Sequence, residues 1–429
     1  LLSKEAYRGV IDELDKSYSF EVDVTKEYMV KTGKEWKQYF KDNNMCISGY
    51  GTVFSMDGYG IFPSLLSEWF AERIHYQDLM GKTNGDEHEY YDKLQYIIKI
   101  LLNSFYGSLL NSYFRYFDIR LGASVTTSGR EVAVHQASQI NLLTMGEYKL
   151  NGGMAIYIDT DSCYFTHPDP NAPIDDVVIY ADKVCKDLNA SFPVFLARAF
   201  LTNEFHSKFV RSTREIVADG GIFVTKKRYI LHVVDKEGKR CDKVKVMGLD
   251  LKKSNLPIYV QETLTKMVID YIKGKDWKTT ISDEVIQFKN TVRNNSIMDI
   301  GIPKGVKKIE HYTQQFELLG MKARLPGHTA ASIFYNIMRK HEEAYDFPAI
   351  TSGSKIRVFK LKQKIGKFKS IALPRDIEDV PEWFEKHVEI NIEEHVKSLI
   401  DNPLNNIMFA VGLKAPTEQS AFIESFLEF

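Results

Sequence analysis

A chain of 429 residues is too long for one compact core, so we expect it to divide into roughly two to four domains. Hydrophobic residues (44%) and aromatic residues (12%) are plentiful enough to exclude disorder over most of the chain. The net charge of −1 excludes a strongly basic protein, so any contact with nucleic acid has to be judged from local clusters of basic residues.

The four cysteines are widely spaced and form no C-x-x-C pair, which argues against a zinc site or a disulfide framework. The sequence has no secretory signal and no run of about 18 uncharged apolar residues, so we expect a soluble cytoplasmic protein with no membrane partner. Because the chain begins with Leu1 and not with methionine, we expect it to be the latter part of a longer protein.

The first third of the chain predicts mainly helices. Residues 1–45 are charged and carry few turn signals, which favours helical structure. Residues 46–60 are rich in glycine and strand-forming residues, which predicts a short hairpin or loop. A helical hairpin is expected over residues 61–110, with one helix opening at Pro63 and a polar turn at 82–89.

The second helix of that hairpin carries polar side chains at helical spacing. Lys99, Asn103 and Tyr106 are separated by four and three residues, so one helical face holds all three. A lone lysine in such an apolar helix is most often a snorkelling residue without a special role. Together with Arg73 on the partner helix, however, the set can grip an extended polyanion such as a nucleoside triphosphate.

Residues 112–250 mix strands and helices, and their clearest pattern is strand–turn–strand at 154–165. Asp159 and Asp161 lie at its turn, and strand alternation predicts that both lean the same way while Thr160 points elsewhere. For Asp-x-Asp alone, an acidic turn in water is the commoner explanation. The alternative is a magnesium site, because Mg²⁺ is usually held by one or two carboxylates and the phosphates of a substrate.

Three consecutive cations occur in the strand-like run at 221–234. A period of two places Lys226 and Arg228 on one side of the strand, with Lys227 and Tyr229 on the other. An edge strand kept soluble by lysines is one explanation. Contact with the phosphates and groove of a nucleic-acid duplex is the other.

Beyond residue 252 the pattern is largely helical, apart from a basic strand region at 355–373. Lys360, Lys362 and Lys364 recur there at strand spacing, in a stretch without an acidic residue. A solvated lysine face explains this pattern as readily as contact with duplex phosphates does.

The last residues form an apolar stripe if they are helical. Phe422, Phe426 and Phe429 are spaced by four and three residues, so they fall on one face of a short helix. Exposed phenylalanines are a liability unless something covers them. They can pack back on the preceding helices or insert into a hydrophobic groove of a partner.

In this order, K-x-x-x-N-S-x-Y-G, D-T-D-S and K-K-R-Y closely resemble the motifs of family B DNA polymerases. Residues 60–73 resemble the first fingers helix of that family, 111–130 the entry to its palm helix, and 246–257 its palm-to-thumb junction. The tail AFIESFLEF at 421–429 is similar to the peptide by which T-even-type phage polymerases dock on a sliding clamp. The resemblance covers the whole chain, most specifically 60–257.

The resemblance implies an α+β right-hand polymerase fold, with helical-hairpin fingers, an antiparallel-sheet palm and a mostly helical thumb. The implied domains are the fingers at 1–111, the palm at 112–252, the thumb at 253–415 and the clamp-binding tail at 416–429. Primer–template DNA, dNTPs and a sliding clamp are the implied partners.

Catalytic roles follow from the same resemblance. Asp161 would be the principal metal-binding carboxylate for two Mg²⁺ ions, Asp159 its weaker or structural neighbour, and Glu215 a further acidic group near the metals. Arg73 and Lys99 would bind the incoming triphosphate.

The remaining implied contacts are to the nucleotide sugar, the DNA and the clamp. Tyr106 would form the floor under the sugar, supported by Asn103, and would disfavour ribonucleotides. The implied DNA contacts are Lys226, Lys227, Arg228, Tyr229, Lys360, Lys362 and Lys364, and the implied clamp contacts are Phe422, Phe426 and Phe429.

One expected motif is missing. The family carries another catalytic aspartate on a strand reading approximately D-x-x-S-L-Y-P-S, ahead of the fingers. Asp57 in DGYGIFPS is a poor candidate, because only 42 positions (99 − 57) separate it from Lys99, too few for a palm strand and a whole fingers domain. The 3′–5′ exonuclease domain is missing as well.

Three interpretations follow. The chain is the C-terminal part of an active polymerase completed by a separate N-terminal polymerase and exonuclease chain, a fragment of a single-chain polymerase, or a non-catalytic DNA-binding and clamp-tethering relative. Retention of both aspartates, Lys99 and the K-K-R-Y motif argues against the third.

Overall fold

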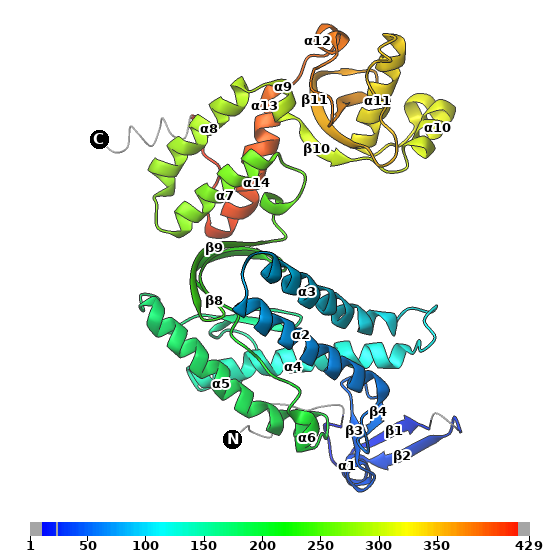
Figure 1. The fold of residues 1–429 in the computed structure, drawn as a ribbon, viewed down its shortest axis with the longest axis vertical. Helices are drawn as coiled ribbons and strands as arrows, with labels where there is room; N and C mark the ends of the chain where they lie inside the picture. Colours follow the sequence, from blue (N-terminus) through cyan, green and yellow to red (C-terminus); the bar gives the residue numbers. More distant parts are fainter. Residues whose placement is uncertain (1–10, 23–24, 419–429) are drawn as a thin grey trace. The chain divides into compact units, whose positions relative to one another are not determined.

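The computed structural model describes residues 11–22 and 25–418, and the chain divides into two compact units, residues 1–215 and 216–429 (Figure 1). Helices and strands mix in both units, in agreement with the predicted α+β class. Within the described residues, each unit has its own clusters of buried hydrophobic side chains.

The first unit contains short hairpins and long helices. Its elements are β1 (Ser17–Glu21), β2 (Tyr28–Thr32), α1 (Gly33–Asp42), β3 (Met45–Ile47), β4 (Val53–Ser55), α2 (Ile61–Lys82), α3 (Gly85–Ser108), α4 (Ile119–Met145), β5 (Ala155–Asp159), β6 (Ser162–Phe165), α5 (Ile174–Ala199) and α6 (Glu204–Ser207).

The prediction of helical structure over 1–45 is wrong for the β1–β2 hairpin, and α1 is the only helix among residues 11–22 and 25–45. Phe20 of β1 packs edge-on against Trp36 and Phe40 of α1, with ring centroids 4.8 and 5.7 Å apart. The helix starts at a reciprocal cap, in which the side chains of Thr32 and Glu35 each bond the other's backbone N–H. The secondary structure of this segment is therefore determined by the burial of its aromatic side chains and not by its charge content.

The hairpin expected at 46–60 is confirmed as β3–β4, and the helical hairpin at 61–110 is confirmed as α2–α3 (Figure 1). The turn between the helices is shorter than predicted, because α3 already begins at Gly85. No residue of α2 is buried, and Ile98 is the one buried residue of α3, both helices being fully described. A hairpin with so little buried surface belongs to the least stable part of a fold.

The core of the first unit lies between α4 and α5. Ile140, Leu188 and Phe192 are buried there, and the β5–β6 hairpin, confirmed at 154–165, packs on α4. His135 is fully buried, stacks on Phe195 at 4.0 Å, and bonds Tyr148 and Ser191 through its two ring nitrogens.

The second unit has two antiparallel sheets, in the orders β7–β8–β9 and β10–β11–β12. Its elements are β7 (Ile216–Thr225), β8 (Arg228–Lys236), β9 (Lys239–Met247), α7 (Ile258–Ile272), α8 (Ser282–Asn294), α9 (Ile297–Ile300), β10 (Ile302–Gly305), α10 (Ile309–Leu319), α11 (Gly327–His341), β11 (Lys355–Ile365), β12 (Phe368–Pro374), α12 (Glu382–His387), α13 (Ile392–Val396) and α14 (Asn402–Met408).

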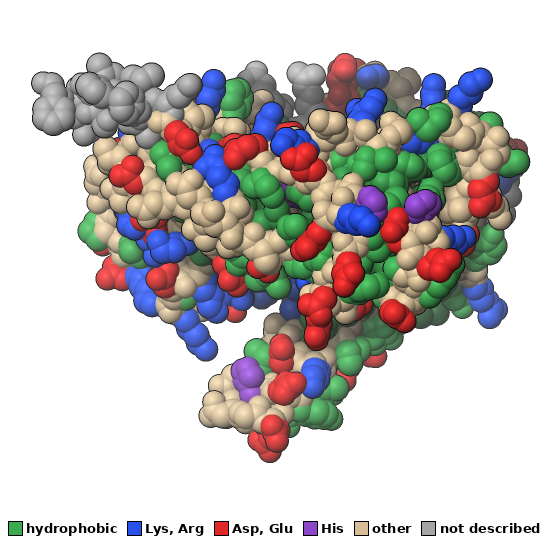
Figure 2. Space-filling model, turned by 90° about the horizontal axis from the view of Figure 1, so that it is seen from above, with side chains coloured by type: hydrophobic (Ala, Val, Ile, Leu, Met, Phe, Trp, Pro, Cys, Tyr) green, Lys and Arg blue, Asp and Glu red, His purple; other side chains and the backbone are tan. Residues whose placement is uncertain are grey.

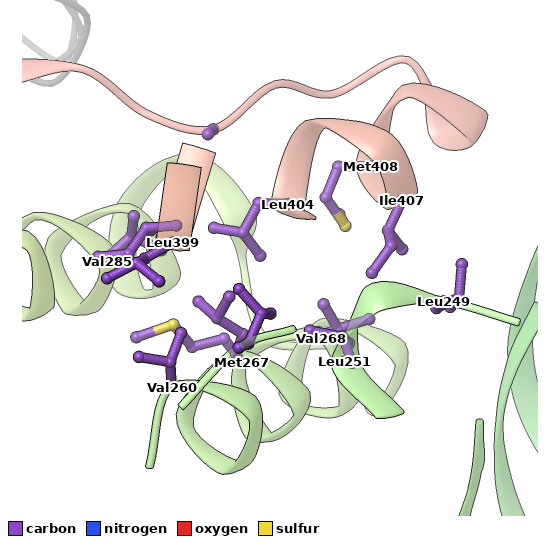
Figure 3. Packing of buried hydrophobic residues seen from close by; sticks show 14 of the residues in the cluster. Leu249, Leu251, Val260, Met267, Val268, Val285, Leu399, Leu404, Ile407 and Met408 are labelled. Carbon is purple, nitrogen blue, oxygen red and sulfur yellow. The ribbon is translucent and has the colours of Figure 1, made fainter. Parts of the chain in front are cut away.

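This unit confirms the largely helical pattern beyond 252 and the strand region at 355–373. Figure 3 shows its main core, where Val260 and Met267 of α7 meet Val285 of α8 and Leu404 of α14. The segment that follows β9 contributes Leu249 to the same core, so the sheet and the helices are held together by one continuous apolar cluster.

A buried histidine joins three segments of the second unit. His395 is fully buried, its Nε2 accepts a hydrogen bond from the backbone N–H of Lys360 at 2.8 Å, and its Nδ1 lies 3.1 Å from the carbonyl oxygen of Ile300. The bond to Nε2 requires a neutral ring with its proton on Nδ1. Burial lowers the pKa of His395 to about 4, and Lys360 adds to this effect.

We therefore expect acid to destabilise the second unit through His395. The folded-state pKa of His395 lies below the ordinary value of 6.5. The stabilisation that neutral His395 gives the folded state is therefore complete above pH ~6.5 and is lost as pH falls towards 4. The full loss is about 3 kcal/mol of unfolding free energy. Urea unfolding at pH 7 and pH 4.5 measures the free energy of unfolding at each pH. That free energy should fall less between the two pH values for His395→Gln than for the wild type. An equal fall would contradict a role of His395 in the acid sensitivity.

Candidate functional site

The two aspartates of the predicted magnesium site lie at a very tight turn. Asp159 ends β5 and pairs with Ser162 of β6, and the backbone N–H of Asp161 donates to the carbonyl oxygen of Asp159 at 2.7 Å. Thr160 between them has a φ of +56°, which is a strained conformation for a β-branched residue. Strain of this kind costs on the order of 1–3 kcal/mol and is concentrated at functional sites.

The turn gives the two carboxylates different surroundings. Asp159 is half-buried and accepts a hydrogen bond from the Thr160 hydroxyl at 3.2 Å, whereas Asp161 is exposed. Asp161 belongs to the turn and not to a strand, so strand alternation does not set its direction as predicted. Two carboxylates at one tip fit a magnesium ion that also takes phosphate oxygens as ligands, but not an ion held by protein alone.

The structure does not gather Glu215 with these aspartates. Glu215 is exposed and lies directly before β7. Over residues 11–22 and 25–418, no group of three or more His, Cys, Asp and Glu side chains is placed to hold a metal ion. A third ligand from Glu215 therefore remains a prediction.

The polar stripe of α3 is present and exposed. Lys99, Asn103 and Tyr106 are all exposed on this continuous helix, and Tyr106 shows 45% of its surface. Arg73 of α2 is half-buried, and its Nε lies 3.4 Å from Oε1 of Gln95. Because Gln95 precedes Lys99 by one helical turn, Arg73 lies against the same face of α3.

Sequence reasoning missed Gln95, although its place one turn before Lys99 was a usable signal. Its Nε2 donates to Oδ1 of Asp92 at 2.8 Å. The amide therefore links Arg73 to an acidic side chain on the stripe and fixes the direction of the guanidinium group.

The K-K-R-Y motif is not one strand, which corrects the predicted alternation. Lys226 and Lys227 form a two-residue turn between β7 and β8, with Lys227 at a φ of +63°. Gly248 lies so close that a Cβ on it would be 2.1 Å from the Lys227 carbonyl oxygen. The turn therefore presents two neighbouring lysines at an exposed tip.

The next two residues of the motif point inward. Tyr229 is only 6% exposed and packs on Phe223 with ring centroids 5.3 Å apart. Arg228 is partly buried, and its Nε has no hydrogen-bond partner among the described residues. Burial leaves Tyr229 as support for the turn, so a direct DNA contact by its ring is not favoured.

A row of charged side chains crosses the same sheet. His232 is buried between Asp219 and Asp242, whose carboxylate oxygens lie 2.6 Å from its two ring nitrogens. Lys273 lies 3.2 Å from Asp242. The hydrogen bond with His232, and then Lys273, lowers the pKa of the Asp242 carboxyl group, and the row ties the three strands together.

Two of the three predicted β11 lysines have partners within the protein. The Nζ of Lys360 donates to Ser398 at 2.7 Å and lies 3.6 Å from Glu394. Lys362 is paired with Glu389, whereas Lys364 is exposed. Figure 2 shows basic and acidic side chains interspersed over one face of the molecule, in keeping with the net charge of −1.

The segment that leads to the tail is firmly attached. Lys289 is buried and donates to the carbonyl oxygen of Pro416 at 2.6 Å, Trp277 Nε1 donates to that of Lys414, and Arg293 pairs with Glu418. The predicted clamp contacts lie outside the described residues: Phe422, Phe426 and Phe429.

No helix among the described residues has the length and apolar content to cross a membrane.

Residues 45–319, well over half of the chain, match the family model for DNA polymerase family B. The chain is 26% identical over 289 residues to the DNA-directed DNA polymerase of Escherichia phage RB69, covering 62% of this chain and 31% of that protein. It is 25% identical over 292 residues to that of Enterobacteria phage T4, with the same coverage. It is 30% identical over 224 residues to DNA polymerase 1 of Pyrococcus abyssi, covering 52% and 25%. The chain therefore spans less than a third of each of these relatives.

Proposed function

Because this chain belongs to DNA polymerase family B, with phage enzymes among its relatives, we propose that it catalyses template-directed DNA synthesis as the C-terminal part of a phage replicative polymerase. In the reaction, the primer 3′-oxygen would attack the α-phosphate of a dNTP, and the bond to the β-phosphate would break to release pyrophosphate. The observation that carries the proposal is the strained Asp159–Thr160–Asp161 tip, which places two carboxylates at one tight turn.

Asp161 and Asp159 would hold the catalytic Mg²⁺, with Asp161 the principal ligand. When bound, the metal neutralises charge on the phosphates and activates the primer hydroxyl. Arg73 would bind the triphosphate with its planar fork and Lys99 with a point charge, since both lie at one face of α3. The exposed ring of Tyr106 would lie beneath the sugar.

The other catalytic aspartate would come from outside residues 1–429. The β5–β6 sheet has only two strands among the described residues, and the edge of a sheet can pair with an added strand. A separate N-terminal polymerase and exonuclease chain, or a preceding segment of the same protein, would supply it. The proposed domains are the fingers at 1–111, an incomplete palm at 112–252, the thumb at 253–415 and the tail at 416–429.

Primer extension tests this function. Purified residues 1–429 should not extend a primed template with Mg²⁺ and dNTPs. Addition of the N-terminal polypeptide that carries D-x-x-S-L-Y-P-S should restore extension. Strong extension by this chain alone would contradict the split palm, and no extension by the pair would favour the non-catalytic DNA-tethering alternative.

We expect the β7–β8 turn to contact duplex phosphates. Lys226→Ala with Lys227→Ala should weaken binding to all duplex sequences alike and reduce the salt slope by about two phosphate equivalents. Lys149→Ala is the control, because this lysine is paired with Glu147 and is not among the implied DNA contacts. Fluorescence anisotropy at several salt concentrations measures the affinity for duplex DNA and its salt dependence. An unchanged salt dependence for the double variant would refute the contact.

The tail would insert its phenylalanines into a groove of a sliding clamp. Because Pro416 and Glu418 are held on α8, the tail starts from a fixed point, which suits tethering. Deletion of residues 420–429 should leave single-nucleotide insertion intact and abolish stimulation by the cognate clamp. Earlier melting of the truncated protein with clamp stimulation retained would show instead that the tail is part of the thumb core.

A further inference from the structure

Three aromatic rings meet on the surface of the first unit, and the proposed function gives none of them a role. The ring centroid of Tyr59, from the segment before α2, lies 5.9 Å from that of Phe205 and 5.8 Å from that of Phe209. The ring centroids of the two phenylalanines lie 5.8 Å apart. The rings are 40%, 48% and 52% exposed, respectively. A contiguous exposed patch of apolar side chains is a mark of an interaction site.

The segment that leads to the two phenylalanines contains a strained residue. Leu201, between α5 and α6, has a φ of +58°, which is strained for a leucine. The carbonyl oxygen of its neighbour Phe200 accepts a hydrogen bond from the backbone N–H of Ile47 in β3 at 2.9 Å. The Tyr59 hydroxyl is fixed by Ser67 at 3.2 Å. Phe205 of the short helix α6 and Phe209 just after it therefore meet a tyrosine from the segment before α2 (Figure 1).

A lysine lies on the rings. The Nζ of Lys208 is 3.9 Å from the centroid of Phe205 and 5.4 Å from that of Phe209. Arg211 is exposed close by, and its Nε donates to the backbone carbonyl of Lys208 at 3.2 Å. Among residues 11–22 and 25–418, neither cation is seen in an ion pair with an acidic side chain. The surface is therefore both aromatic and positively charged.

That chemistry suits single-stranded nucleic acid more than an apolar polypeptide. Bases stack on aromatic rings whatever their identity, and a cation among the rings binds the phosphates between the bases. A polypeptide partner would need acidic side chains to match Lys208 and Arg211, whereas every nucleotide carries that charge in its backbone.

We propose that Tyr59, Phe205, Phe209 and Lys208 form a stacking platform for the unpaired template strand. The proposal rests on the proposed function, because DNA synthesis supplies a template with both duplex and single-stranded parts. It adds a binding surface made of residues other than those of the β7–β8 turn and of the aspartate tip.

Fluorescence anisotropy with the full chain tests the platform. The probes are a blunt duplex and the same duplex with a 5′ extension of about ten thymidines, within the usual range of site sizes. The wild type should bind the extended duplex more tightly. Phe205→Ala with Phe209→Ala should weaken binding to the extended duplex about tenfold or more and leave the blunt duplex unchanged. Tyr113→Ala, which removes a 97% exposed ring of the same unit, should change neither.

A second variant guards against an effect on folding. Lys208→Gln removes the charge, keeps the rings, and should reduce the salt slope for the extended duplex by about one phosphate equivalent. The proposal is overturned if the extension adds no affinity or if the double variant keeps the added affinity. If the wild type binds neither probe even with the N-terminal polypeptide added, the proposed function fails and the platform with it.

Discussion

Asp161→Asn is expected to lower the rate of primer extension by several orders of magnitude while leaving the affinity for primer–template DNA unchanged. The amide has the size of the carboxylate but lacks its charge, and Mg²⁺ is held by carboxylate oxygens. The turn itself should survive, because the hydrogen bond that closes it joins the backbone N–H of Asp161 to the carbonyl oxygen of Asp159. Single-turnover extension by the completed polymerase, with anisotropy for DNA binding, measures both quantities.

Two further substitutions make this result specific. Asp159→Asn should lower the rate of primer extension less than Asp161→Asn does, because Asp159 is half-buried and already accepts a hydrogen bond from Thr160. Asp169→Asn removes the same charge from an exposed loop of this unit and should have no effect on rate. Near wild-type extension by Asp161→Asn would remove Asp161 from the catalytic site.

Elements with a strong local pattern could be predicted from the sequence. The α2–α3 hairpin follows from its helical periodicity and turn, and the β5–β6 hairpin from two apolar runs around Asp159 and Asp161. Both aspartates lie within three residues of one another, so a local motif was sufficient to place them together. Arg73 and Lys99 come together for a similar reason, since they belong to consecutive antiparallel helices.

The errors arise where distant residues decide the structure. The Lys226–Lys227 turn has no glycine or asparagine, the usual signals of a two-residue turn, so it reads as a continuous strand. What makes the turn possible is Gly248, whose missing side chain leaves room for the Lys227 carbonyl. In the same way, the ion pair of Lys362 with Glu389 could not be predicted, because Glu389 comes much later in the chain.

Charge removal on the α2–α3 hairpin should have the second-largest effect. We expect Lys99→Ala and Arg73→Ala each to lower kcat/KM for the incoming dNTP by about 10- to 100-fold, since a hydrogen bond to a charged group contributes about 1.5–3 kcal/mol. Arg73→Lys should recover only part of the loss, because an ammonium group lacks the planar fork of arginine. Single-nucleotide insertion measured over a range of dNTP concentrations gives both kcat and KM.

The controls for this hairpin lie on the same helix. Lys93 is also on α3 but is paired with Glu89 at 2.7 Å, so Lys93→Ala should leave kcat/KM unchanged. Gln95→Ala should produce a smaller loss than Arg73→Ala, because it frees the guanidinium group without removing its charge. If Lys99→Ala and Lys93→Ala behave alike, the exposed stripe of α3 is a solvated face and the triphosphate is bound elsewhere.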